Sequence, residues 1–281
     1  MAELFMGQNN QYDDIPELID VEPKNEAIPD FTRDSCTYTK QYCEENVWYL
    51  CKRFIEDHPD IPAYAVFISN PQKTVAIWHQ KSSQDEESPV VWDYHVVLAA
   101  FVGSAPQTPN GSNHRAWWVW DLDTTLPFPC AAPPYFRRAF RPSGGTRTPY
   151  LPSFRVVPAG DFLARFASDR RHMRIQGQWL APPPATPALR GELAVADFNL
   201  QNYINMLPVE TEEQRQEAQK QDENSPFHGL AEKYELSSNP EGMGVVLNLT
   251  NLISTFCGSS DSFSELLLAA REGLNFPFLS S

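Results

Sequence analysis

The most constraining feature of this sequence is a change in hydrophobic periodicity at Pro59. Ahead of that proline, apolar residues recur at helical spacing from about Cys43 onward, and the proline ends the run. Beyond it, short runs rich in β-branched and aromatic residues are separated by polar or Pro/Gly/Asn stretches: Ala63–Ser69, Thr74–His79, Val90–Phe101 and Ala116–Asp121. Such spacing is typical of a meandering antiparallel sheet.

Further helices are expected later in the chain. Asp161–Arg171 has apolar residues on one side, and Ser262 with Glu265 forms a capping box ahead of an apolar run. The Arg- and Pro-rich stretch Ala131–Pro149 is expected to be a loop. One helix, then strands, then more helices predicts an α+β fold: a single domain in which helices flank an antiparallel sheet.

Two segments are expected to stand outside the folded core. Residues 1–30 are rich in Asp, Glu, Asn, Gln and Pro without periodicity, which predicts a disordered acidic tail ahead of a domain over residues 31–281. The Glu/Gln/Lys-rich block at about 208–240 has almost no apolar face, so we expect a mobile acidic insertion or a solvated helix there.

The charge balance narrows the classes of partner. With 22 Lys and Arg against 36 Asp and Glu, the formal net charge of −14 argues against binding to nucleic acid or anionic membranes and tolerates a cationic ligand. No run approaches the roughly 20 apolar residues of a membrane helix, and the acidic N-terminus resembles neither a signal nor a transit peptide. Five cysteines, an odd number, favour free thiols in a reducing compartment, so we expect a cytoplasmic protein and leave a nuclear location open.

Cys43 is the first residue that indicates chemistry. It lies in the first turn of the expected helix, where free N–H groups and the helix dipole stabilise an anion, so we expect a depressed thiol pKa. The neighbouring Glu44 and Glu45 oppose thiolate formation unless they point away. Most cysteines are small buried hydrophobic residues, and we interpret Cys51, on the apolar stripe of the same helix, in that way.

A histidine and two aspartates follow on the expected strands. His95 lies between apolar residues, so its ring needs a partner, although a satisfied core histidine fits the same pattern. Asp121 and Asp123 end the next strand and share one face, so alternation does not choose between them. A cysteine at a helix start, a histidine on a strand and an aspartate on the next strand match the nucleophile, base and orienting carboxylate of a thiol hydrolase.

Other chemistries have less support in the sequence. There is no C-x-x-C pair, and the six histidines show neither H-x-x-x-H nor H-E-x-x-H spacing, so we expect no metal site. A Gly-rich phosphate loop and the G-x-S-x-G elbow of serine hydrolases are also missing, and the thiol chemistry described above needs no cofactor.

Five blocks of sequence together resemble the protein N-terminal glutamine amidohydrolase family. They occur in the family's order: Tyr42–Trp48, Ala65–Asn70, Trp92–Leu98, Asp121–Cys130 and Phe166–Met173. The resemblance covers about Cys36 to Pro184 and resumes more loosely at Asn199–Met206 and Gly242–Phe256. The longer N-terminal tail, the acidic insertion and the Ala131–Pro149 stretch depart from the family pattern, which leaves loop contacts with substrate open.

The resemblance implies a papain- and transglutaminase-like cysteine hydrolase core. Its catalytic triad would be Cys43, His95 and Asp121, which selects Asp121 over Asp123. The implied reaction converts the N-terminal glutamine of a protein or peptide to glutamate through a thioester, releases ammonia and feeds the N-degron pathway. A monomer is expected.

Recognition of a free α-ammonium group requires an acceptor in the site, because a blocked or internal glutamine then leaves a polar partner unpaired. Glu45, Asp93 and Asp169 are the carboxylates we consider for that role, although a capping or solvated role fits each of them as well. Two alternatives use the same residues differently. One is a peptidase or transglutaminase with this triad, and the other is a protein that binds N-terminal residues without turnover.

Overall fold

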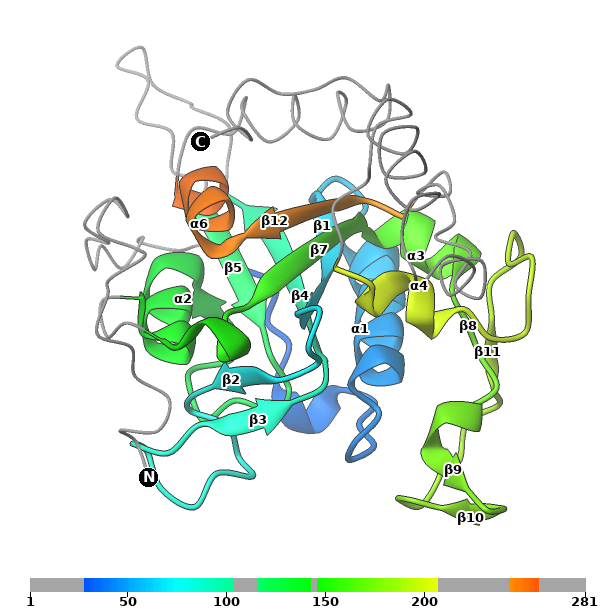
Figure 1. Ribbon diagram of the computed structural model, residues 1–281. Coiled ribbons are helices and arrows are strands. Elements are labelled where there is room, and N and C mark those ends of the chain that lie inside the picture. The colour runs from blue at the N-terminus through cyan, green and yellow to red at the C-terminus, as the bar shows by residue number, and fades with distance from the viewer. Residues whose placement is uncertain (1–27, 104–115, 143–145, 207–242, 258–281) are drawn as a thin grey trace, which may run out of the picture.

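The computed structural model describes residues 28–103, 116–142, 146–206 and 243–257 (Figure 1). The predicted insertion at 208–240, the capping box at Ser262 and Glu265, and the tail up to residue 27 lie outside the described residues. Residues 28–30, the last positions of the predicted tail, are among the described residues, and Pro29 is buried.

A six-stranded antiparallel sheet forms the centre of the molecule. Its strands lie in the order β12-β7-β1-β4-β5-β6. The bounds are β1 Ala63–Ser69, β4 His95–Val102, β5 Ala116–Trp120, β6 Cys130–Ala131, β7 Ser153–Pro158 and β12 Val245–Asn248. The antiparallel sheet and its flanking helices confirm the predicted α+β fold with a single domain.

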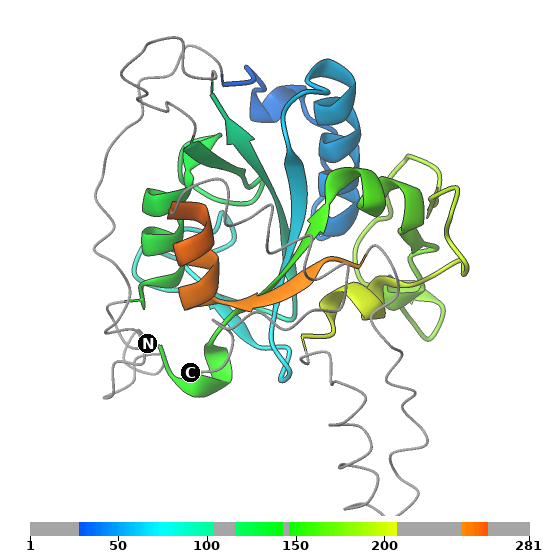
Figure 2. The ribbon, with the colours of Figure 1, turned by 90° about the horizontal axis from the view of Figure 1, so that it is seen from above.

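Helices cover both faces of this sheet (Figures 1 and 2). One apolar core lies between the sheet and α1, α3 and α4, and a second lies between the sheet and α2 and α6. The helices are α1 Cys43–Asp57, α2 Ala132–Phe140, α3 Ala159–Arg165, α4 Leu200–Ile204 and α6 Leu249–Cys257. Within the described part of the chain, no helix is long and apolar enough to span a membrane.

Short elements complete the fold. Three two-stranded ladders pair β2 with β3, β8 with β11, and β9 with β10. Their bounds are β2 Val75–Ile77, β3 Val90–Trp92, β8 Ala167–Ser168, β9 Arg174–Ile175, β10 Gln178–Trp179 and β11 Leu189–Arg190, and single 3₁₀ turns span Arg33–Ser35, Thr148–Tyr150 and Arg171–Met173.

The strand predicted over Val90–Phe101 is two strands, and the break positions the site. Asp93 and Tyr94 separate β3 from β4, so that His95 becomes the first residue of β4 in the main sheet. The break is held by two hydrogen bonds: Ser69 Oγ donates to the Asp93 carbonyl at 2.6 Å, and the Tyr94 N–H donates to Asp93 Oδ1 at 2.9 Å. A single run of apolar residues does not reveal such a change of sheet.

Two other predictions about secondary structure are wrong. The expected loop at Ala131–Pro149 contains α2, whose two prolines lie in its first turn, where a backbone N–H has no helical partner to lose. The helix expected over Asp161–Arg171 ends at Arg165. The chain is extended from Phe166 onward because Ala167–Ser168 pairs with β11 and Asn199 bonds both Arg165 O and Ala167 N.

Candidate active site

A cavity of about 720 Å³ opens beside the start of α1. Cys43 lines it together with residues from β3, from the β3–β4 break and from α4. Several titratable residues also line this space: Lys40, Lys73, Lys81, Asp93, Asp123 and His172. A volume in this range is typical of a site that encloses a ligand of several residues or a comparable small molecule.

Cys43 is the first residue of α1, as predicted, and only 5% of it is exposed. Its thiol donates to Glu44 Oε2 across 3.8 Å, and the N–H of Val96, next to His95, donates to its sulfur. Burial raises the pKa of the Cys43 thiol well above its ordinary value, and the Glu44 carboxylate raises it further. The expected depressed pKa is therefore wrong, because the sulfur is desolvated and Glu44 does not point away.

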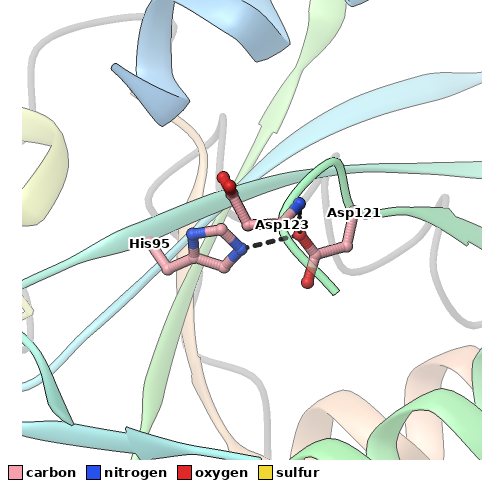
Figure 3. A group of neighbouring side chains, drawn as sticks. All are labelled: His95, Asp121 and Asp123. Carbon is pink, nitrogen blue, oxygen red and sulfur yellow. Dashed lines mark hydrogen bonds and ion pairs between the residues drawn. The ribbon is translucent and has the colours of Figure 1, made fainter. Parts of the chain in front are cut away.

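His95 and Asp121 form a buried pair at the ends of adjacent strands (Figure 3). Neither side chain is exposed, and His95 Nε2 lies 2.9 Å from Asp121 Oδ1. The pKa of His95 is raised because the charge and hydrogen bond of Asp121 outweigh burial, which acts in the opposite direction. The pKa of Asp121 is lowered, since its partners outweigh the effect of burial.

The geometry distinguishes Asp121 from Asp123. Asp121 Oδ1 also accepts the N–H of Asp123 at 2.9 Å, and Oδ2 accepts the Tyr135 hydroxyl at 2.9 Å and Gln80 Nε2 at 3.3 Å. The carboxylate of Asp123 points away from the His95–Asp121 contact (Figure 3) and accepts the Tyr38 hydroxyl at 2.6 Å. Asp121 is thus the carboxylate that contacts the imidazole.

The second nitrogen of His95 has no partner among the described residues. Nδ1 is buried and makes no hydrogen bond, while the ring stacks on Trp92 with centroids 5.0 Å apart. With the hydrogen on Nε2 directed at Asp121, Nδ1 keeps a lone pair that can accept a proton. The indole limits access of water to the imidazole and favours its cationic form.

The same residues bear on metal binding. His95, Asp121 and Asp123 each present one possible ligand atom, and these atoms lie within 4.8 Å of one another (Figure 3). Both oxygens of Asp121 already accept hydrogen bonds, so a metal ion would displace a satisfied network. The arrangement suits a hydrogen-bonded base better than a metal centre.

The chain is similar to known proteins over most of its length. Residues 38–256 match the family described as N-terminal glutamine amidase. The chain belongs to this family. It is 43% identical to the protein N-terminal glutamine amidohydrolase of Danio rerio over 179 residues. The aligned residues cover 62% of this chain and 82% of that relative. The relative of the same name in Homo sapiens is 41% identical over 180 residues. That alignment covers 63% of this chain and 81% of the human protein.

Of the three carboxylates considered for substrate recognition, the structure places Glu45 in a closed ion pair. It contacts Arg170 through two hydrogen bonds of 2.8 Å, and the two side chains are 2% and 8% exposed. Arg170 also donates to the carbonyls of Pro184, Thr186 and Pro187. Glu45 therefore anchors a proline-rich loop to α1 and has no oxygen without a partner for a substrate cation.

Asp93 and Asp169 lie in different surroundings. Asp93 is exposed and lines the cavity that contains Cys43. Asp169 is not among the residues that line this cavity, and it pairs with Arg171 at 2.6 Å on a surface turn. The hydrogen bonds from Arg171 lower the pKa of Asp169. The structure thus brings Asp93 near Cys43 and leaves Asp169 outside the cavity.

The sequence did not single out a second group of residues around Cys43. Glu44, Tyr94 and His172 meet there: the Tyr94 hydroxyl donates to Glu44 Oε2 at 2.8 Å, and His172 Nε2 lies 3.4 Å from Glu44 Oε1. Glu44 directly follows Cys43, and Tyr94 directly precedes His95. These positions beside the predicted catalytic residues are the sequence signal that could have identified them. His172 comes from a distant turn, so only the tertiary structure brings it to this place.

Proposed function

We propose that this protein hydrolyses the side-chain amide of an N-terminal glutamine in proteins and peptides, giving glutamate and ammonia. Membership of the N-terminal glutamine amidase family is the observation that carries this proposal. The cavity beside Cys43 and the buried His95–Asp121 pair support it, since amide hydrolysis by a thiol needs a nucleophile and a fixed base.

In the proposed mechanism, Cys43 is the nucleophile and His95 the base. The raised pKa of the thiol favours a neutral thiol in the resting site, and His95 acts as a base in its neutral form. The thiol proton moves to Nδ1 of His95 as the sulfur attacks the δ-carbonyl carbon. Asp121 accepts a hydrogen bond from the Nε2–H group of His95 and stabilises the imidazolium that forms.

The tetrahedral intermediate needs donors for its oxygen. The backbone N–H of Cys43 stands at the start of α1, where Tyr42 supplies no side-chain cap. Such an N–H group, with the positive end of the helix dipole, stabilises an oxyanion. Collapse of the intermediate breaks the C–N bond, and ammonia leaves with the proton that His95 returns.

The remaining γ-glutamyl thioester is hydrolysed in the second half of the cycle. Water gives a proton to His95 and adds to the thioester carbonyl, the C–S bond breaks, and the thiol is restored. The product carries an N-terminal glutamate. We place this reaction in the N-degron pathway, in the cytoplasm and nucleus, with the enzyme acting as a monomer and without a cofactor.

The test uses four matched peptides. The first begins with a free Gln, the second with an acetylated Gln and the third with another residue but carries Gln internally, while the fourth begins with Asn. We expect ammonia and a mass increase of about 1 Da from the free-Gln peptide alone, since amide to acid exchanges NH₂ for OH. Cleaved peptide or an amine crosslink would favour a peptidase or transglutaminase. No product from any peptide, with folded and reduced protein, would overturn the proposal.

A further inference from the structure

Glu44 is a buried carboxylate that no Arg or Lys side chain neutralises in the described part of the chain. It is 0% exposed, and its Oε1 atom accepts no hydrogen bond there. The nearest basic group is His172 Nε2, at 3.4 Å from Oε1. Removal of a carboxylate from water is strongly unfavourable unless a cation or several donors compensate it. The charge of Glu44 is thus incompletely matched within the protein, at a position beside Cys43.

Other carboxylates near Cys43 are already matched or remain solvated. Glu45 is saturated by Arg170. Asp123 accepts the Tyr38 hydroxyl and is only partly buried, and Asp93 is exposed. Water competes for a ligand at an exposed carboxylate, so discrimination against a neutral ligand is weak there. A desolvated carboxylate discriminates far more strongly, because a neutral ligand leaves its charge unmatched.

The distances suit the α-amino group of a glutamine whose side chain lies at Cys43. In glutamine, the α-nitrogen stands about 4–5 Å from the δ-carbon by ordinary bond lengths. Glu44 Oε2 is 3.8 Å from the Cys43 sulfur, and the Tyr94 oxygen is 2.8 Å from the same Oε2 atom. Tyr94 and His172 line the cavity, and both contact Glu44, which is not itself among the lining residues.

We propose that the cluster of Glu44, Tyr94 and His172 recognises the α-ammonium group of the substrate. Tyr94 gives its hydroxyl hydrogen to Glu44, so its oxygen lone pairs accept the ammonium, and the carboxylate supplies the compensating charge. Burial, and then Glu44, raise the pKa of Tyr94 well above its ordinary value, which keeps the phenol protonated. This proposal rests on the function proposed above, because that function requires a free α-amino group on the first residue of the substrate.

The test compares two substrates: a peptide with N-terminal Gln, and the same peptide beginning with 4-carbamoylbutanoyl, which is glutamine without its α-amino group. We expect the intact protein to favour the Gln peptide in kcat/KM on the order of 100-fold or more. Glu44→Gln should reduce this ratio at least roughly tenfold, mainly through KM for the Gln peptide. A change in Cys43 reactivity affects both substrates and cancels in the ratio.

Asp93→Asn and Asp123→Asn are the matched controls, and each should leave the ratio unchanged. A Glu44→Gln variant that slows both substrates equally, or a control variant that removes the preference, would overturn the assignment to this cluster. Tyr94→Phe keeps the ring and should lower the ratio by a smaller factor. It decides the question if Glu44→Gln does not fold. Failure of the proposed function itself gives a different result: no ammonia from the Gln peptide with the intact protein.

Discussion

Glu44 and Glu45 are consecutive residues in the first turn of α1, and both are buried, but their surroundings differ. Glu45 belongs to a closed cluster, in which Arg170 fills both carboxylate oxygens and also ties down three loop carbonyls. Glu44 belongs to an open cluster with Cys43, Tyr94 and His172, in which one carboxylate oxygen is unfilled.

Carboxylate and imidazole atoms that are buried without a hydrogen bond are found around the candidate site. Among the described residues, three carboxylate or imidazole atoms are buried without a hydrogen bond: Glu44 Oε1, His95 Nδ1 and His172 Nδ1. All three belong to residues around the cavity or to the catalytic pair we propose. Buried polar groups are usually satisfied, so we interpret these three atoms as places where a ligand or a transferred proton completes the network.

The largest expected effect is the loss of activity in Cys43→Ala. We expect ammonia release to fall about 10⁴-fold or more, because the nucleophile is removed, while the melting temperature changes little. Cys51→Ala, two turns along the same helix, is the matched control. It should keep full activity and lose about 1 kcal/mol of stability, because that thiol only fills the core. Equal activity in the two variants would contradict the assignment of Cys43.

Asp121→Asn should lower kcat by roughly 10³- to 10⁴-fold, because the imidazole loses its orienting carboxylate. It should also move the pH dependence. His95 must be neutral to accept the thiol proton, and Asp121 raises its pKa, so activity of the intact protein should fall as pH drops through a value above 6.5. Without the carboxylate, burial lowers the pKa of His95, and this acid limb should shift to lower pH. A pH–rate profile with an unmoved limb would contradict the role of His95.

Arg170→Met tests the closed cluster. It leaves Glu45 buried without its cation, so we expect a loss of about 3–5 kcal/mol in the free energy of unfolding, measured by urea titration. The double variant with Glu45→Leu should recover much of this loss, since it removes the unpaired charge. Activity per folded molecule should change far less than in Cys43→Ala. A stable Arg170→Met protein without activity would mean that the closed cluster takes part in the reaction.

Asp169→Asn should have the smallest effect. Asp169 pairs with Arg171 on the surface, and their side chains are 35% and 61% exposed. Exposed ion pairs contribute little, because solvent screens them, so the melting temperature should stay within about 2 °C and kcat/KM within about twofold. A large rise in KM for the Gln peptide would show that Asp169 contacts the substrate despite lying outside the cavity.

The sequence by itself determined the elements that carry the proposed chemistry. The apolar stripe of Val47, Leu50 and Phe54 fixes α1 with Cys43 at its start, and runs of β-branched and aromatic residues fix β1 and β5. These predictions succeed because periodicity and propensity act over neighbouring residues. The sequence also supplied the family, through blocks that a family profile matches over residues 38–256.

Only the tertiary structure decided which polar groups meet. Periodicity left Asp121 and Asp123 equivalent, and the strand ends place Asp121 against His95. Arg170 contacts Glu45 although 125 positions separate them in the sequence. His172, two residues after Arg170, contacts Glu44. The pKa of Cys43 follows from these contacts and from burial, not from its helical position. Desolvation and pairing depend on neighbours that are remote in sequence, so local patterns do not carry that information.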